Sequence, residues 1–108
     1  MPLSDLNRIK QFVSVAHDIE TALSVTLLQK KILLKLIDLH TQNEAPTTIS
    51  DLASSVEGIS SRSVLRHLDT LKNLGWIKIQ IAREDQRIKY ITPTPRLIRT
   101  LSHQLSYL

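Results

Sequence analysis

The hydrophobic period of the sequence changes at Trp76, and this change constrains the possible fold more than any other feature. Before it, apolar residues recur about every 3.6 positions, which is the spacing of amphipathic helices. The run that begins at Trp76 alternates instead, so Ile77, Ile79 and Ile81 are expected on one buried face of a strand. A polar turn and a second alternating run at 87–92 follow. The pattern predicts a set of helices and one β-hairpin.

Two long helical segments come first. The first, at about 4–23, begins with Ser4 as its cap. Its apolar stripe is expected at Leu6, Ile9, Phe12, Val13, Ala16, Ile19 and Leu23. The second begins near Thr26, because Thr26 and Gln29 have the spacing of a capping box, and it ends where Glu44 and Ala45 precede Pro46. Its apolar face is wide, so we expect this helix at the centre of the core.

Two short helices joined by a tight turn precede the hairpin. Thr48 resembles a capping-box residue and begins the third helix, which is expected to end at Gly58. Either Ser60 or Ser61 caps the fourth helix, and Gly75 closes it. The fourth helix is expected to bury Val64, Leu68 and Leu71.

A last helix opens at Thr94, with Pro95 in its first turn. Its apolar stripe is expected at Leu97, Ile98, Leu101, Leu105 and Leu108. The order predicts a mainly α (α+β) fold, a winged helix-turn-helix with about five helices and a two-stranded β-hairpin wing, in one domain spanning 1–108. Residues 47–92 form the helix-turn-helix and wing. The helices at about 4–23 and 94–108 are expected to form a homodimer, because exposed apolar stripes mark interfaces.

The fourth helix has the size of a recognition helix, which reads base edges in the major groove of DNA. With its apolar residues turned inward, its opposite surface is expected to present Ser61, Arg62, Ser63, Arg66, His67 and Thr70. Arginine pairs with guanine or clamps a phosphate, and the serines suit phosphates near a helix N-terminus. A surface helix with two solvated arginines explains the same residues, so this helix alone leaves DNA binding open.

The hairpin tip favours DNA binding. Its candidate DNA-binding residues are Arg83, Asp85, Arg87 and Lys89. An arginine at this position can enter the minor groove, where the negative potential is strongest, and a neighbouring carboxylate can hold the guanidinium in a fixed fork. Trp76 directly follows a glycine cap and is expected to anchor the hairpin in the core.

Charge is divided unevenly along the chain. Residues 1–58 carry five Lys/Arg and seven Asp/Glu, whereas residues 59–108 carry nine and three. Such a basic half indicates a polyanionic partner. We therefore expect a sequence-specific regulator of transcription that binds double-stranded DNA. The alternative is a winged-helix module that binds protein within a replication, transcription or chromosome-organising assembly.

Other classes of function find little support in the sequence. The absence of cysteine excludes disulfides, thiolate metal sites and a cysteine nucleophile. The four histidines lack the spacing of metal ligands, and the two glycines fit helix ends rather than a phosphate-binding loop. We predict no enzyme, no metal and no cofactor. With no signal peptide and no membrane-length apolar run, a cytoplasmic protein is expected.

The sequence resembles the MarR family of bacterial transcription regulators over about residues 24–100. The resemblance is carried by residues 48–53, 63–71 and 75–77, by the wing tip Asp85, Gln86 and Arg87, and by residues 90–94. It implies a homodimer in which the terminal helices of two subunits pair. It also implies that Arg87 matches the wing arginine that reaches the minor groove, with Asp85 as its acidic partner. Family members are usually longer, and the glycine often found in their final helix is absent here.

Overall fold

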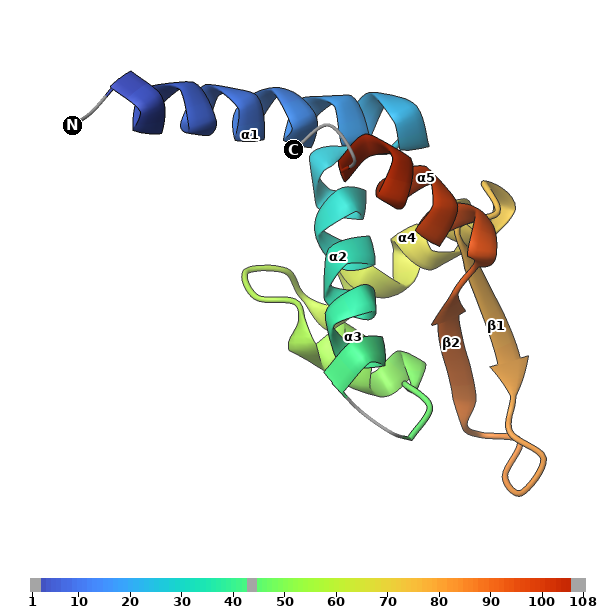
Figure 1. Cartoon of the computed structure of the whole chain (residues 1–108). Coiled ribbons are helices and arrows are strands. Elements are labelled where there is room, and N and C mark those ends of the chain that lie inside the picture. The colour runs from blue at the N-terminus through green and yellow to red at the C-terminus, as the bar shows by residue number, and fades with distance from the viewer. Residues whose placement is uncertain (1–2, 43–44, 106–108) are drawn as a thin grey trace.

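The computed structural model describes the backbone of residues 3–42 and 45–105, and their side chains except at 3–5, 11–16 and 105. Within the described residues, five helices and two strands follow the predicted order (Figure 1). They are α1 (Leu3–Leu23), α2 (Leu27–Gln42), α3 (Ile49–Ser55), α4 (Ser61–Asn73), β1 (Ile77–Ile81), β2 (Lys89–Pro93) and α5 (Pro95–Leu105). The predicted fold is confirmed. Predictions for the side chains of Ser4, Phe12, Val13, Ala16, Glu44, Leu105 and Leu108 lie outside the described residues.

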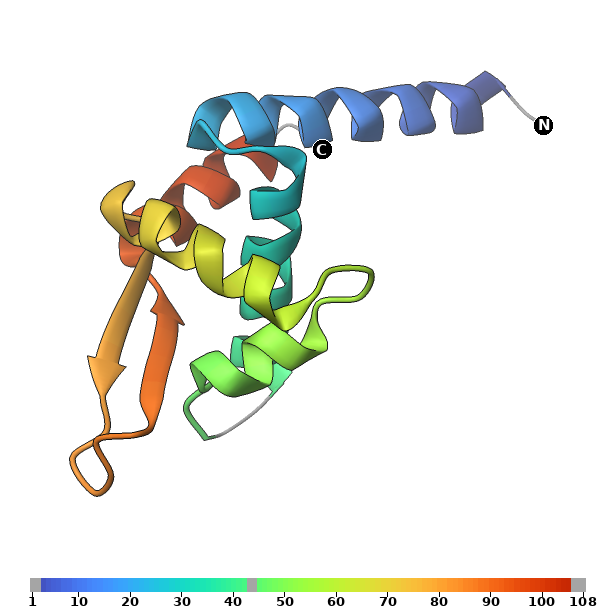
Figure 2. The same ribbon diagram turned by 180° about the vertical axis from the view of Figure 1, so that it is seen from behind.

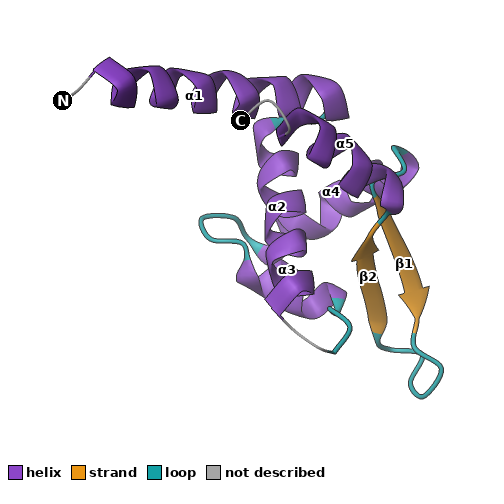
Figure 3. Cartoon of the chain, in the orientation of Figure 1, coloured by secondary structure: helices purple, strands orange, loops and turns teal. Residues whose placement is uncertain are grey.

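Helix α1 lies across one end of the molecule, and α5 packs against it near its C-terminal half (Figures 1 and 2). The N-terminal half of α1 projects beyond the other elements. Helix α2 runs from the end of α1 toward α3, and the wing, made by β1 and β2, extends away from α1 (Figure 3). The tip of the wing and helix α1 therefore lie at opposite ends of the molecule, and α5 leads from the base of the wing to α1. None of the helices described is long and apolar enough to cross a membrane.

One hydrophobic core joins all seven elements. Its fully buried side chains include Leu23, Leu36, Leu52, Val64, Leu71, Ile91 and Leu97. As predicted, Val64, Leu68 and Leu71 turn inward from α4, and α2 lies at the centre of the cluster. The stripe on α5 is only partly covered, since Leu97 and Leu101 are buried whereas Ile98 is 43% exposed.

Short-range hydrogen bonds begin the helices where the sequence predicts. Thr26 and Gln29 form a reciprocal capping box, each backbone N–H donating to the other side chain at 3.1 Å. Thr48 caps α3 by accepting from the backbone N–H of Asp51 at 3.0 Å. Ser60, rather than Ser61, caps α4.

The two glycines stand in turns with positive φ, at +77° for Gly58 and +84° for Gly75. Helix α3 nevertheless ends at Ser55, earlier than predicted, because the next residue, Val56, is already extended and buried. Gly58 therefore belongs to the turn between α3 and α4 and is not the helix cap itself. Gly75 follows α4 closely and redirects the chain into the wing.

Trp76 anchors the wing as predicted. Its side chain is 4% exposed, and its indole N–H donates to the carbonyl oxygen of Leu23 at 2.9 Å. The guanidinium carbon of Arg96 lies 4.3 Å from the ring centroid, which is a cation–π distance. The first residue after Gly75 thus joins the wing to the end of α1 and to α5.

The wing is an antiparallel pair in register from Ile77 with Pro93 to Ile81 with Lys89. Strand β2 begins at Lys89 instead of the predicted Arg87, because the segment before it forms a hydrogen-bonded turn. The predicted burial of Ile81 is wrong: its side chain is 61% exposed, since the wing extends past the edge of the core. Ile77 is buried as expected.

Candidate nucleic-acid interface

The outward face of α4 is set by the residues that it buries. At 100° per residue, the direction opposite Val64, Leu68 and Leu71 is occupied by Arg62, Arg66, Asp69 and Asn73, with Thr70 beside them. All five of these outward residues are exposed. The structure therefore brings together the predicted Arg62, Arg66 and Thr70 on one accessible helix face.

Ser63 and His67 do not lie on that face, although the sequence suggested that they would. Both are only half exposed, because the helical period turns them toward the flank of α4 rather than straight outward. On this flank, Nδ1 of His67 lies 3.2 Å from Nε2 of Gln29, a buried residue of α2. The Gln29 amide oxygen already accepts from Thr26, so its NH₂ group is the donor and Nδ1 accepts. His67 thereby helps to fix α4 on α2.

The hydroxyl groups at the N-terminus of α4 are also engaged within the protein. The hydroxyl of Ser61 donates to the carbonyl oxygen of Ala53 at 3.3 Å, which ties α4 to α3. The backbone N–H of Ser63 donates to the cap hydroxyl of Ser60 at 3.2 Å. These contacts position the helix-turn-helix, and the phosphate contacts expected for the hydroxyls of Ser61 and Ser63 stay a prediction.

Four exposed residues of α4 are not among the predicted DNA-binding residues: Leu65, Asp69, Lys72 and Asn73. Leu65 is 49% exposed, which is a large fraction for a leucine in a helix with an apolar inner face. The signal was present in the sequence, because counting from Val64 in steps of 100° places Asp69 and Asn73 opposite the core. The sequence reasoning assigned Ser63 and His67 to this face instead of Asp69 and Asn73.

At the wing tip, Asp85 holds Arg87 by three hydrogen bonds. Its Oδ1 accepts from the backbone N–H and from Nε of Arg87 at 3.0 and 3.1 Å, and its Oδ2 accepts from Nη2 at 3.0 Å. This is the predicted fork. The side chain of Arg87 remains 90% exposed, whereas that of Asp85 is 30% exposed. The guanidinium is thus oriented by the protein and fully accessible from outside.

The charges of the tip are coupled to their neighbours. The hydrogen bonds from Arg87 hold the pKa of Asp85 below its ordinary value, and the same pairing raises the pKa of Arg87. The hydroxyl of Tyr90 donates to Oε1 of Glu84 at 2.8 Å, which lowers the pKa of Glu84 and raises that of Tyr90. Both carboxylates are therefore ionised at neutral pH and engaged with wing residues. The predicted Arg83 and Lys89 are exposed beside them.

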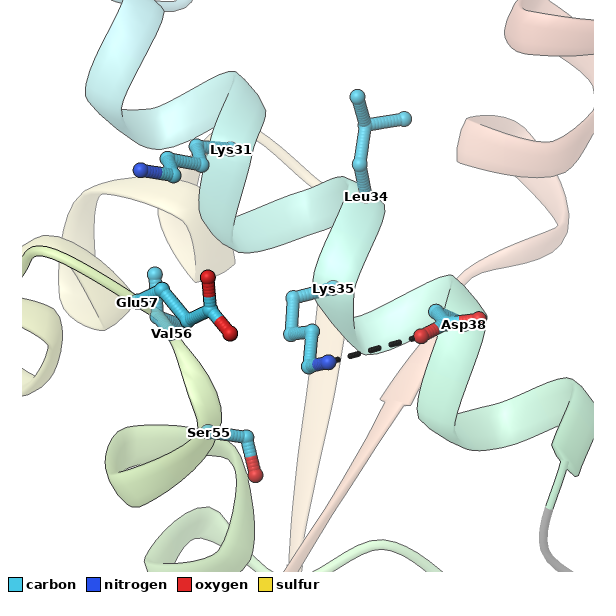
Figure 4. Close-up of a pocket in the computed structure, with 7 residues that line it drawn as sticks. All are labelled: Lys31, Leu34, Lys35, Asp38, Ser55, Val56 and Glu57. Carbon is cyan, nitrogen blue, oxygen red and sulfur yellow. Dashed lines mark ion pairs between the residues drawn. The ribbon is translucent and has the colours of Figure 1, made fainter.

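Among the open grooves that the described residues form, two have the following linings. One, of about 390 Å³, separates α4 from the wing. The other, of about 420 Å³, lies between α2 and the end of α3 and is lined by Lys31, Lys35, Asp38 and Glu57 among others (Figure 4). In this second groove Nζ of Lys35 lies 3.6 Å from Oδ2 of Asp38, so its charges are partly balanced. Within the described residues, no group of three or more histidines and carboxylates could hold a metal ion.

Comparison with known proteins gives a clear result for the fold. No protein-family model and no curated protein matches the sequence. Among solved structures, the MepR–DNA complex of S. aureus superposes with a TM-score of 0.74 at 17% identity, covering 97% of this chain and 82% of that one. Reduced AbfR bound to DNA superposes with a TM-score of 0.65 at 22% identity, covering 96% of this chain and 72% of that one. MarR superposes with a TM-score of 0.65 at 21% identity, covering 98% of this chain and 74% of that one. These neighbours are MarR-family regulators, and the chain has their winged-helix fold.

Proposed function

We propose that this chain is a sequence-specific transcription regulator that binds double-stranded DNA, with α4 in the major groove and the wing at an adjacent minor groove. The observation that carries the proposal is the wing tip. Arg87 is 90% exposed yet held by Asp85 through a two-pronged pairing. A guanidinium ordered in this way loses less conformational freedom when it enters a narrow, electronegative groove. The protein-binding alternative gives no comparable reason for an ordered cation at an exposed tip.

The recognition helix supports the same function. Helix α4 has 13 residues and is therefore about 20 Å long. The major groove of DNA, about 12 Å wide, admits an α-helix. Arg62 and Arg66 stand one turn apart on its accessible face, where each can pair with guanine or with a phosphate. Helix α3 and the Ser61 contact hold this face in place. The DNA-bound states of MepR and AbfR, which share this fold, are consistent with such a use of the helix.

The functional unit that we propose is a cytoplasmic homodimer that acts by binding rather than by catalysis. The projecting half of α1 carries Leu6 and Ile9, each 49% exposed, and α5 carries Ile98, which is 43% exposed. A second copy of the chain would cover these side chains. Two-fold symmetry would then place two recognition helices about 34 Å apart, facing half-sites separated by one turn of DNA. Size-exclusion chromatography with light scattering measures this stoichiometry directly.

Binding to a selected operator and to random duplex tests the proposed roles. The operator is obtained by selection from a random duplex pool and compared with random DNA of equal length in a mobility-shift assay. Arg66→Ala is expected to lose about 1–3 kcal/mol on the operator and much less on random duplex, because it removes a base contact. Arg87→Ala is expected to weaken both complexes to a similar extent.

Lys31→Ala serves as the matched control, because it also removes one exposed cation but lies in the groove between α2 and the end of α3, outside α4, the wing and the proposed dimer interface. It is expected to bind both duplexes like the wild type. Selection that yields no preferred sequence would contradict sequence-specific binding. A chain that ignores DNA but captures a protein through α4 would support the alternative.

A further inference from the structure

The groove between α4 and the wing is open and has a mixed lining. It is lined by Ile49, Leu65, Leu68, Asp69, Lys72, Ile79, Ile81 and Lys89, and its volume is about 390 Å³. We call it the α4–wing groove. Two of its apolar side chains are unusually exposed, Ile81 at 61% and Leu65 at 49%. Neither is needed for the core, since the buried side of α4 and the start of β1 already supply it.

The position of this groove follows from the two elements that form its walls. If α4 occupies a major groove and the wing reaches the neighbouring minor groove, one sugar–phosphate strand separates the two sites. That strand must pass between α4 and the wing, because both elements contact the same face of the duplex. The α4–wing groove lies between these elements, since residues of α4, β1 and β2 line it; Figure 2 shows α4 in front of the base of the wing.

The lining of the groove matches a sugar–phosphate strand. Lys72 reaches it from α4 and Lys89 from β2, so each wall supplies one exposed cation for phosphate oxygens. Leu65, Ile79 and Ile81 present aliphatic surface of the kind that packs against the carbon atoms of deoxyribose. The fold leaves these aliphatic side chains uncovered beside two lysines, so they are accessible to a strand that carries both sugars and phosphates.

We propose that the α4–wing groove seats the sugar–phosphate strand that divides the two DNA grooves, with Lys72 and Lys89 on its phosphates and Leu65 and Ile81 against its sugars. This inference rests on the proposed DNA-binding function and extends it to a defined backbone site. Asp69 lines the same groove, and its carboxylate repels the strand. Asp69 therefore weakens binding to DNA of any sequence.

Salt dependence tests the two cations. Binding of a random 30-base-pair duplex is followed by fluorescence anisotropy from 50 to 200 mM salt. Lys72→Ala and Lys89→Ala are each expected to reduce the slope of log K against log salt by about 0.9 per protomer. Between 50 and 200 mM salt, the binding constant of each variant is therefore expected to fall by about 3.5-fold less than that of the wild type. Lys31→Ala, in the groove on α2, is expected to keep the wild-type slope.

Two further variants test the lining without removing a cation. Ile81→Asp places a carboxylate where the strand is proposed to lie and is expected to weaken binding at least tenfold. Its control, Leu34→Asp, changes a similarly exposed aliphatic residue in the groove on α2 and is expected to have no effect. Asp69→Asn is expected to strengthen binding about threefold. Circular-dichroism melting verifies that each variant folds like the wild type.

The outcomes separate this inference from the proposed function. One outcome is that the wild type binds DNA and Arg87→Ala weakens the complex, while the lysine variants keep the wild-type slope and Ile81→Asp binds normally. This outcome overturns the proposal that the α4–wing groove binds the sugar–phosphate strand, and it leaves the DNA-binding function standing. A wild-type chain that binds no duplex at 50 mM salt overturns the proposed function itself. Reduced salt slopes for Lys72→Ala and Lys89→Ala, together with weak binding by Ile81→Asp, establish that the groove binds the strand.

Discussion

Replacing Trp76 by phenylalanine is expected to loosen the connection between the wing and the terminal helices. Trp76 begins the wing, and its indole N–H donates to the carbonyl oxygen of Leu23, the last residue of α1, at 2.9 Å. Both residues are buried, at 4% and 1% exposure. Phenylalanine keeps an aromatic ring under the guanidinium of Arg96 but has no donor for this carbonyl.

The cost follows from these contacts. A buried acceptor that loses its donor costs about 1–3 kcal/mol. The smaller ring also leaves space in the core, and complete truncation of a buried aromatic side chain costs about 3–5 kcal/mol. Trp76→Phe retains most of the ring, so the expected loss in free energy of unfolding is about 2–4 kcal/mol. For a domain of this size, the unfolding midpoint falls by about 8–16 °C.

Thermal unfolding followed by circular dichroism at one fixed protein concentration measures this shift, because association would make the midpoint depend on concentration. Tyr90→Phe is the matched control, since it also removes one aromatic donor, but from the exposed bond to Glu84 on the wing. Its midpoint is expected within about 2 °C of the wild type. A Trp76→Phe midpoint no lower than that of Tyr90→Phe would refute the role assigned to the indole bond.

Three further predictions concern the turn, the capping box and the wing tip. Gly75→Ala is expected to destabilise the fold by about 1–3 kcal/mol in urea unfolding, because φ is +84° and the new Cβ would lie 2.8 Å from Nη1 of Arg96. Gln29→Ala removes the acceptor of the Thr26 backbone N–H, which is one half of the capping box of α2, and also the partner of His67, and a loss of about 1–2 kcal/mol is expected in the same assay. The pKa of Asp85 is lowered in the folded state, so its pairing is intact at neutral pH and is lost as the pH falls through that lowered pKa. NMR of the paired guanidinium protons should show their protection disappearing in this acidic range and not at pH 6.

Several features that sequence reasoning predicted correctly are fixed by neighbours along the chain. The inward turn of Val64 and Leu68 follows from helical period alone. The pairing of Asp85 with Arg87 joins residues two positions apart, so a tight turn suffices to form it. The start of α3 at Thr48 is equally local, because its cap bond spans three residues.

Two of the features that sequence reasoning missed depend on residues far apart in the chain. His67 was expected at the accessible face, but its position is set by Gln29, which lies 38 residues earlier. The alternation of β1 continues through Ile81, yet burial stops sooner because the helices do not extend along the whole wing. Alternation shows which side chains share a face. It does not show how far the covering helices reach.

The salt dependence of binding to duplex DNA tests the central claim most directly. Apart from Arg66, which is assigned to a base, five exposed cations of the α4 face, the α4–wing groove and the wing are available to phosphates: Arg62, Lys72, Arg83, Arg87 and Lys89. If each neutralises one phosphate, the slope of log K against log salt is about −4.5 per protomer, and affinity falls about 500-fold between 50 and 200 mM salt. We expect the wild-type chain to bind random duplex with this steep dependence of affinity on salt, as a DNA-binding protein does. No binding at 50 mM salt, or a slope near zero, would contradict it.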